Sequence, residues 1–457
     1  PGVGWSREFE NPMNATRDTA ARDFVVGLGA TGLSIARYLQ RNDIDATFFD
    51  TREVPPGIDE LRELFPDASV LLGDAELPSK ISRIIASPGV AESHPILVNA
   101  RKAKLEVISD IELFARDARA PFVAVTGSNG KSTVTTLLYH MCAAAGLEVR
   151  AGGNLGEPAL DLLVGDVPDV YVLELSSFQL QRTANLPAEV AVLLNISRDH
   201  LDWHKDEEEY RATKYRIFRE AKAAVINRAD PRAIEVVSKL ERVTTFGLDE
   251  PEEGQYGIRV VDGEKFLARG ETLLLAAREL ALFGTHNQAN ALAALAAGEL
   301  AGLEMSPMLQ VLTEFPGLPH RMQFVRRIGS VSYVNDSKAT NVAAAIASIE
   351  SVDGMLVLIA GGLGKGADFS ELAAPLENKL RALVLIGADA QEIADGVDTI
   401  MPVYFARDMQ DAVEQAAAFA EADDTVLLAP ACASLDQFDN YGARGDAFAN
   451  AVGGLKQ

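Results

Sequence analysis

The chain has 457 residues, which gives room for about three domains of roughly 150 residues each. Its 66 acidic and 42 basic residues give a formal net charge of −24, so nucleic acids and anionic membranes are disfavoured as partners. No apolar run approaches the ~18 residues of a membrane span, no signal segment is evident, and the two cysteines cannot build a disulfide framework. Together these features predict a cytoplasmic protein.

Strand-like runs alternate with helical patterns along the chain, which predicts parallel α/β sheets. The expected strands fall into three groups: residues 24–26, 47–49 and 83–86; then 122–125, 171–173, 190–194 and 223–226; then 331–334, 355–359, 382–386 and 426–428. Residues 246–275 carry short strand-like runs and glycines and predict a small antiparallel insert. With boundaries near 107–110 and at FPGLPHR (315–321), we expect α/β domains at 20–110, 111–317 and 318–457.

Near the N-terminus, VVGLGATG holds Gly27, Gly29 and Gly32 in the pattern G-x-G-x-x-G, and Asp50 ends the next predicted strand. This spacing is typical of dinucleotide-binding folds, in which the glycines let the backbone approach a diphosphate. It is compatible with an NAD-dependent oxidoreductase. The glycines do not report a nicotinamide, however, and another nucleotide diphosphate would fit the same turn.

The stretch TGSNGKST (126–133) follows a predicted strand and opens a helical pattern that Gly146 closes. That context is the one a phosphate-binding loop requires, although Val125 stands where the usual motif has its first glycine. Lys131 would lie on the β- and γ-phosphates, and the hydroxyl of Ser132 or Thr133 on Mg²⁺. The alternative is an ordinary tight strand–helix turn. The pattern favours a nucleotide site.

Two further features follow predicted strands. Glu174 ends the strand of YVLELSS, where ligands of parallel sheets gather, and a carboxylate there can hold Mg²⁺. Such a Glu alone is more often a surface residue or the partner of a nearby cation. In NISRDHLDWH (195–204), Asp199, His200 and Asp202 fall within four positions. A single His is usually structural or solvated, but this cluster favours a metal or catalytic role.

Several motifs in fixed order resemble those of the Mur ligases of peptidoglycan synthesis: TGSNGKST, LELSSFQL, NISRDHLDWH, ATKYRIF, GTHNQANALAALA and GLPHR. Together with folylpolyglutamate synthetases, this family carries the phosphate loop without the first glycine. NDSKATN (335–341), GGLGKGADFS (361–370) and PACASLDQFDNYGARGDAF (430–448) are similar to the branch that adds D-glutamate. Tyr441 departs from the Phe familiar at that position.

The resemblance implies a Rossmann-like N-terminal domain, a central P-loop ATPase-type domain and a Rossmann-like C-terminal domain. It also implies a reaction in which the carboxylate of UDP-N-acetylmuramoyl-L-alanine attacks the γ-phosphate of ATP, giving an acyl phosphate and ADP. The amine of D-glutamate then displaces phosphate and forms an amide. Because two anions meet in the first step, Mg²⁺ and cationic side chains are required. The resemblance implies two Mg²⁺ sites.

The resemblance also assigns residues by motif. The catalytic positions are Lys131, His200, Lys214 and Arg321, and the metal positions are Ser132, Glu174, His200 and Lys214. ATP contacts fall on Gly127, Ser128, Asn129, Gly130, Lys131, Ser132, Thr133, Asn287, Asn290, Arg321 and Asp336. The UDP-substrate contacts are Thr31, Asp50, Arg52, Gly89, Asn154 and His200. The D-glutamate contacts are Lys338, Thr340, Lys365, Ser434, Leu435 and Tyr441.

Simpler roles stand beside some of these assignments. Asn287 or Asn290 can cap a helix, and Arg321 can form a surface ion pair. Lys214 matches a carbamylated lysine of the family, but it can also be a solvated helix lysine paired with Glu207 or Glu220. For the whole chain, the alternatives are a folylpolyglutamate-synthetase-like enzyme, another Mur ligase, an oxidoreductase, or a nucleotide switch without ligase activity. We expect a monomer that binds small molecules.

Overall fold

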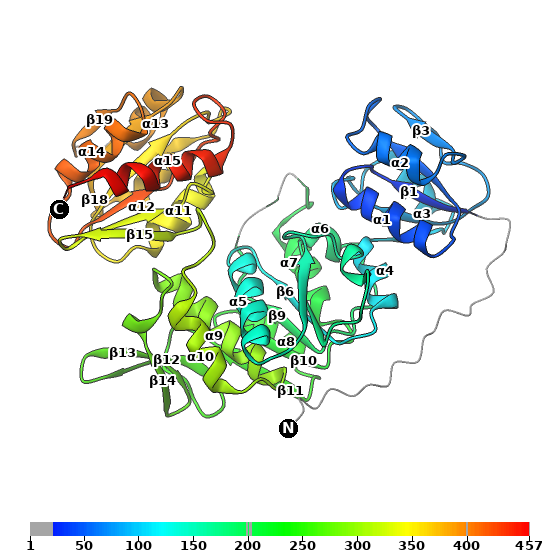
Figure 1. Ribbon diagram of the computed structural model, residues 1–457, viewed down its shortest axis with the longest axis horizontal. Helices are drawn as coiled ribbons and strands as arrows, with labels where there is room; N and C mark the ends of the chain where they lie inside the picture. The colour runs from blue at the N-terminus through cyan, green and yellow to red at the C-terminus, as the bar shows by residue number, and fades with distance from the viewer. Residues whose placement is uncertain (1–21, 198–199, 201–202, 399–400, 457) are drawn as a thin grey trace. The chain divides into compact units, whose positions relative to one another are not determined.

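The computed structural model of the protein describes residues 22–197, 200, 203–398 and 401–456. They form two compact units: one reaches to Leu275 and includes Asn290–Val311, and the other contains Ala276–Ala289 and the residues from Leu312 onward. Figure 1 shows three sheets with helices packed against them, coloured blue, cyan to green, and yellow to red. Every strand predicted from the sequence is present, so the predicted three-domain α/β class is confirmed.

The N-terminal sheet is parallel and has the strand order β3-β2-β1-β4-β5. Its strands are β1 (Arg22–Val26), β2 (Ala46–Asp50), β3 (Val70–Leu72), β4 (Ile81–Ala86) and β5 (Glu106–Ile108); its helices are α1 (Ala30–Arg41), α2 (Ile58–Leu64) and α3 (Pro95–Lys102). The order reverses between β1 and β4, and ligands of such sheets bind at this point, beyond the strand carboxyl ends. The turn between β1 and α1 therefore lies where such a sheet would bind a nucleotide.

The central sheet has the order β14-β13-β12-β11-β10-β9-β6-β8-β7. Its strands are β6 (Phe122–Thr126), β7 (Val149–Gly153), β8 (Val170–Glu174), β9 (Val190–Leu193), β10 (Ala223–Asn227), β11 (Arg242–Phe246), β12 (Tyr256–Val261), β13 (Glu264–Arg269) and β14 (Thr272–Ala276). Its helical segments are α4 (Asp110–Asp117), α5 (Lys131–Ala144), η1 (Asp161–Leu163), α6 (Ser177–Leu180), α7 (Glu207–Tyr215), η2 (Arg216–Phe218), α8 (Pro231–Val237), η3 (Ala277–Glu279), α9 (Thr285–Leu300) and α10 (Met305–Glu314).

The predicted insert is part of this sheet. β12 and β13 pair antiparallel, as expected, while a parallel pair between Phe246 of β11 and Tyr256 of β12 joins them to the parallel strands. The insert thus extends the edge of the central sheet and leaves its middle strands, β9, β6 and β8, unchanged.

The C-terminal sheet has the order β15-β16-β20-β17-β18-β19, with only β15 antiparallel to its neighbour. Its strands are β15 (Gln323–Ile328), β16 (Val331–Asn335), β17 (Leu356–Gly361), β18 (Leu380–Ile386), β19 (Val403–Phe405) and β20 (Thr425–Leu428); its helical segments are α11 (Val342–Ser351), η4 (Phe369–Leu372), α12 (Ala373–Leu376), α13 (Ala390–Val397), α14 (Met409–Phe419) and α15 (Tyr441–Gly454). Because side chains alternate along a strand, β17 serves two cores. Leu356 and Leu358 pack with α11 and α13, and Val357 and Ile359 pack with α14 and α15.

Candidate functional site

The loop between β6 and α5 has the geometry of an anion-binding turn. Gly130 has a φ of +83° and precedes the first residue of α5, a conformation that favours glycine. Lys131, Ser132 and Thr133 form the first helical turn, where free backbone N–H groups and the helix dipole attract phosphate. A Cβ at Gly130 would lie 2.3 Å from Oδ1 of Asn290, so that predicted ATP contact does lie against the loop.

Val125 replaces the usual glycine because this position belongs to the strand. Its side chain is fully buried in β6, between Val192 of β9 and Glu174 of β8 in the strand register. β6 continues to Thr126, whose hydroxyl donates to the Leu175 carbonyl over 2.7 Å. The turn therefore begins at Gly127, and a larger side chain at 125 adds to the core without entering the loop.

Two lysines converge on the carbonyl of Gly127. Nζ of Lys131 donates to the carbonyls of Gly127 and Ser128, each over 2.9 Å. Nζ of Lys214, from α7, donates to the same Gly127 oxygen over 2.9 Å, and Lys214 is only 2% exposed. The alternative that Lys214 is a solvated lysine paired with Glu207 or Glu220 is therefore wrong. α7 places Lys214 at the phosphate loop.

Glu174 lies at the carboxyl end of β8, next to the β6 strand that leads into the loop. It is 2% exposed, so the alternative of a surface carboxylate is wrong. Oε1 accepts from Nδ2 of Asn154 over 2.6 Å, but Oε2 is buried and has no hydrogen-bond partner among the described residues. A buried acceptor without a donor is costly, and a hard cation would satisfy it. The residues present thus fit Mg²⁺.

The segment after β9 is described only in part, because Asp199 and Asp202 lie outside the described residues. His200 is exposed, has a φ of +54°, and its ring centroid lies 4.8 Å from that of Phe178. Sequence reasoning passed over His204, which is buried, with Nε2 3.0 Å from the Ser177 hydroxyl. Among the described residues, no group of three or more His, Cys, Asp or Glu is arranged to hold a metal. Mg²⁺ sites often take only one or two carboxylates and complete their shell with substrate phosphate and water.

A pocket of about 570 Å³ lies at the carboxyl ends of β1, β2 and β4. It brings together five of the six predicted UDP-substrate residues, Thr31, Asp50, Arg52, Gly89 and Asn154, together with Gln179. The first four come from the N-terminal sheet and the last two from the central sheet. Since Asn154 also donates to Glu174, this pocket reaches the carboxylate beside the phosphate loop.

The carboxylate of Asp50 accepts hydrogen bonds from other protein groups within this pocket. Oδ2 accepts from the Leu28 N–H over 2.7 Å and from Nη2 of Arg52 over 2.7 Å, while Oδ1 accepts from Nε of Arg52 over 2.8 Å. Burial raises the pKa of Asp50, but the bonds from Arg52 and Leu28 outweigh it and lower the pKa to about 2. In an NAD site the equivalent carboxylate receives the ribose hydroxyls. Here it holds Arg52 beside the glycine turn.

The second unit carries other predicted ATP contacts, at the start of α9, just before β15 and just after β16. Asn287 is buried and donates from Nδ2 to the Phe283 carbonyl over 2.7 Å, as a residue within the first helical turn can. Asp336 follows β16; its carboxylate accepts from the Met322 N–H over 3.2 Å and from the Ser348 hydroxyl. Burial raises the pKa of Asp336, although the Ser348 bond and the charge of nearby Arg321 oppose it. Arg321 is thus close to Asp336 and is itself exposed.

The motifs predicted to bind D-glutamate meet in the second unit. Leu363 and Ala433 exchange backbone hydrogen bonds of 2.9 and 3.0 Å, which joins the loop of Lys365 to the loop of Ser434 and Leu435. Lys365 is exposed with a φ of +55°, Ser434 is buried and Leu435 is exposed. Nζ of Lys338 lies 4.1 Å from the ring centroid of Tyr441, a cation–π contact. Thr340 follows two residues later, and its N–H donates to the Lys338 carbonyl.

Arg444 ties these loops together, and sequence reasoning missed it. Its guanidinium, 1% exposed, donates to the carbonyls of Ser337, Gly361 and Cys432 over 2.9 to 3.3 Å, and to the Ser337 hydroxyl over 3.0 Å. Burial lowers its pKa to about 10. A basic residue in YGARGD gives no sequence signal for such a role, because its partners are backbone atoms of distant loops.

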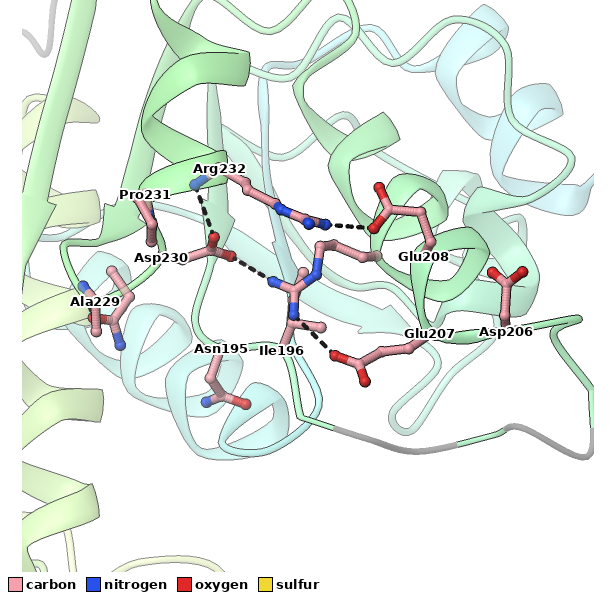
Figure 2. A pocket seen from close by; sticks show the side chains of 11 residues that line it. Asn195, Ile196, Asp206, Glu207, Glu208, Ala229, Asp230, Pro231 and Arg232 are labelled. Carbon is pink, nitrogen blue, oxygen red and sulfur yellow. Dashed lines mark hydrogen bonds and ion pairs between the residues drawn. The ribbon is translucent and has the colours of Figure 1, made fainter.

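Another pocket was also missed. It has a volume of about 720 Å³ and lies between the starts of α7 and α8, beyond β9 and β10. Figure 2 shows Arg232 of its wall in contact with Glu208. Arg211 connects Asp230 with Glu207. Asn195 connects it to the phosphate loop, since it accepts from the Asn129 N–H and donates to the Asn129 carbonyl. This wall supports the loop from the β9 side.

Comparison with known proteins identifies the chain's relatives. Three family models match: a MurD-like N-terminal domain over residues 21–109, the Mur ligase middle domain over 125–298, and the Mur ligase glutamate ligase domain over 320–432. The predicted limits 20–110, 111–317 and 318–457 stay a prediction.

Solved structures show a similar fold. A pseudomurein peptide ligase type C from Methanothermus fervidus has a TM-score of 0.58 at 20% identity, and a UDP-N-acetylmuramate-alanine ligase from Thermotoga maritima has a TM-score of 0.55 at 19% identity. Each match covers 95% of this chain and the whole of the other, and each shows a shared fold.

Relatives of higher identity are similar over nearly the full length. A UDP-N-acetylmuramoylalanine--D-glutamate ligase from Pseudomonas putida is 49% identical over 94% of this chain and 97% of its own. A protein of the same name from Nitrosococcus oceani is 47% identical over 95% of this chain and 96% of its own. With an intact phosphate loop, the glycine turn and three matching domain models, the chain belongs to the Mur ligase family.

Proposed function

We propose that the protein joins D-glutamate to UDP-N-acetylmuramoyl-L-alanine at the expense of ATP, through an acyl phosphate. The observation that carries this proposal is the link between two binding sites in one unit. The pocket of Asp50 and Arg52 reaches Asn154, Asn154 donates to Glu174, and Glu174 lies on the strand next to the phosphate loop. A uridine substrate bound in that pocket would direct its far end toward the γ-phosphate of ATP.

In this assignment the protein holds two anions in contact. Lys131 and the N–H groups from Gly127 to Thr133 hold the β- and γ-phosphates, and Asn287 and Asn290 lie three residues apart on one face of α9 for the adenine. Arg321 contacts the γ-phosphate and Asp336 the ribose. Ser132 and Glu174 would hold one Mg²⁺, and His200 and a carbamylated Lys214 a second. When bound, Mg²⁺ neutralises phosphate charge and so lets the carboxylate approach.

We assign D-glutamate to the second unit, where the loop of Lys365 is joined to the loop of Ser434 and Leu435. D-glutamate carries two carboxylates, and Lys338, Lys365, Thr340 and Ser434 supply cations and hydroxyls in an otherwise acidic chain. Leu435 and Tyr441 are exposed apolar side chains beside them, suited to the methylene carbons. The nucleotide substrates suggest a cytoplasmic enzyme, and we propose that it acts as a monomer. Among the described residues, no helix has the length and apolarity to cross a membrane.

An oxidoreductase is disfavoured by the carboxylate of Asp50, which is occupied by Arg52 and Leu28. We expect a ligase for another amino acid, or a folylpolyglutamate-like enzyme, to carry different residues after the aspartate that matches Asp336. A phosphate-release assay distinguishes these candidates. With ATP and UDP-N-acetylmuramoyl-L-alanine present, we expect phosphate release with D-glutamate but not with L-glutamate or meso-diaminopimelate. Release with L-glutamate or meso-diaminopimelate alone, or without any amino acid, would reject the proposal.

A further inference from the structure

Arg182 connects the two sheets of the first unit. It lies just after α6, on the segment that continues from Glu174, and it is 5% exposed. Its Nη1 donates to the Ser87 carbonyl over 2.8 Å, its Nη2 donates to the Val90 carbonyl, and its Nε donates to the Glu92 carboxylate over 2.6 Å. All three acceptors belong to the loop between β4 and α3 of the N-terminal sheet.

The two carbonyls are the two ends of one turn. The Val90 N–H donates to the Ser87 carbonyl over 3.1 Å, which closes a four-residue turn with Pro88 and Gly89 at its tip. Both tip residues line the pocket of Asp50 and Arg52. The Ser87 hydroxyl also donates to the Gly27 carbonyl over 2.9 Å, so the same turn is attached to the glycine loop on the other side of the pocket.

Burial of this guanidinium needs a reason. Burial, together with the charge of Arg101, lowers the pKa of Arg182 to about 10. A buried ion pair commonly gives no more stability than apolar residues of similar volume, so stability alone does not explain an arginine here. The planar fork, by contrast, bonds two acceptors at a fixed separation, which an apolar side chain cannot do. Here it fixes the distance between the ends of the Pro88–Gly89 turn.

We propose that Arg182 is a positioning residue for the uridine substrate: from the central domain, it holds the Ser87–Val90 turn in the shape that the nucleotide diphosphate meets. The inference rests on the proposed function, because the pocket is assigned to that substrate there. Arg182 itself lies behind the turn and acts through Pro88 and Gly89. The ATP and D-glutamate sites have no part in this contact, so the effect is confined to one substrate.

Two substitutions and a matched control test the proposal in the full-length protein. Arg182→Met removes the donors and keeps the apolar stem, and Arg182→Lys keeps the charge but cannot bond both carbonyls in one plane. Arg37→Met is the control, since Arg37 of α1 also joins the two sheets, through Asp161 over 2.7 Å, but does not contact the turn. The readouts are the Kd for UDP by calorimetry, the KM for each substrate, and the melting temperature.

We expect the Kd for UDP and the KM for the uridine substrate to rise about ten-fold in Arg182→Met and less in Arg182→Lys, with the KM values for ATP and D-glutamate unchanged. Arg37→Met should bind UDP as the wild type does, even if its melting temperature falls. Should Arg182→Met fail to fold, Arg182→Lys decides. Unchanged UDP binding in the Arg182 variants, or an equal rise in all three KM values, would overturn the inference. Wild-type protein that does not bind UDP would instead overturn the proposed function.

Discussion

At the scale of single residues, the phosphate loop depends on buried polar side chains that come from other elements. Lys214 from α7 and Lys131 from α5 contact the same carbonyl, and Glu174 from β8 keeps one oxygen without a donor among the described residues. Such unsatisfied buried groups cost stability and are retained at functional sites. Two predictions follow from these side chains.

The first concerns Lys214. A carbamate on its amine would offer oxygen ligands to Mg²⁺, whereas a plain ammonium would repel the metal. We expect Lys214→Ala to lose activity by about 100-fold or more, with partial rescue by a small carboxylic acid. Lys214→Arg should be equally poor in phosphate release, because it keeps the charge but cannot form the carbamate. Lys222→Ala is the control, as this exposed lysine pairs with Glu189 at the surface. Full activity in Lys214→Arg would exclude the carbamate.

The second concerns Glu174. In Glu174→Gln we expect phosphate release to fall about 100-fold, with a higher Mg²⁺ requirement, because a metal ligand loses its charge. Without Mg²⁺ its melting temperature should equal or exceed that of the wild type, since a buried charge has been removed. Glu112→Gln is the contrast: its carboxylate accepts from the N–H groups of Ala184 and Asn185, so the amide should cost about 2 kcal/mol. A Glu174→Gln variant that loses as much stability as Glu112→Gln would mean that Glu174 is structural.

At the scale of elements, α4 joins the N-terminal sheet to the central one. Phe114 packs edge-on against Phe122 and Tyr171, and Asp110 begins the helix fully buried. One oxygen of Asp110 has no partner among the described residues, and the other accepts a long bond of 3.5 Å from Gln179. Burial therefore raises the pKa of Asp110 to about 6, against the lowering effect of the Gln179 bond.

This shift predicts a pH-dependent stability. The folded-state pKa of Asp110 lies above its ordinary value of 3.8, so the folded protein binds the proton more tightly than the unfolded chain does. Ionisation of the buried Asp110 carboxyl lowers the free energy of unfolding by about 3 kcal/mol above about pH 6. Below about pH 4 the carboxyl is protonated in both states, and this loss of stability is absent. Asp110→Asn should thus be more stable than the wild type at pH 8 in chemical denaturation, and the difference should shrink at pH 5. An equal difference at both pH values would refute the assignment.

The sequence predicted the buried parts of these elements and missed the exposed ones. β6 and β17 contain continuous apolar runs, whereas β3 has three half-buried residues, β7 contains two glycines, and β15 carries two arginines. Those strands form because neighbouring strands offer backbone partners, which no local pattern reveals. Asp50 and Glu174 were found because they end strands. Arg182, Arg444 and Asp110 were missed because their roles depend on backbone atoms and burial far along the chain.

At the scale of the whole molecule, the proposed ATP contacts are divided between the two units. Lys131 and Asn290 belong to the first, and Arg321 and Asp336 to the second. Since neither unit carries all of the proposed ATP contacts, we expect ligand binding to drive a domain closure.

We therefore expect small-angle scattering to show a smaller radius of gyration with an ATP analogue and the uridine substrate than without ligands. Lys131→Ala, which loses the phosphate contact, should compact less at the same ligand concentrations. Equal scattering curves with and without ligands, or full compaction in Lys131→Ala, would contradict this division of the site.

On the proposed function, the substrate bound in the pocket of Asp50 and Arg52 reacts with the γ-phosphate of the ATP that the phosphate loop holds. The most direct test supplies UDP-N-acetylmuramoyl-L-alanine with ¹⁸O in its terminal carboxylate, together with ATP and D-glutamate. If the carboxylate attacks the γ-phosphate, one labelled oxygen passes to the phosphate and the amide product keeps the other. Mass spectrometry should find one ¹⁸O in each molecule of released phosphate. Unlabelled phosphate released together with the amide product would contradict the acyl-phosphate route and the joined site on which it depends.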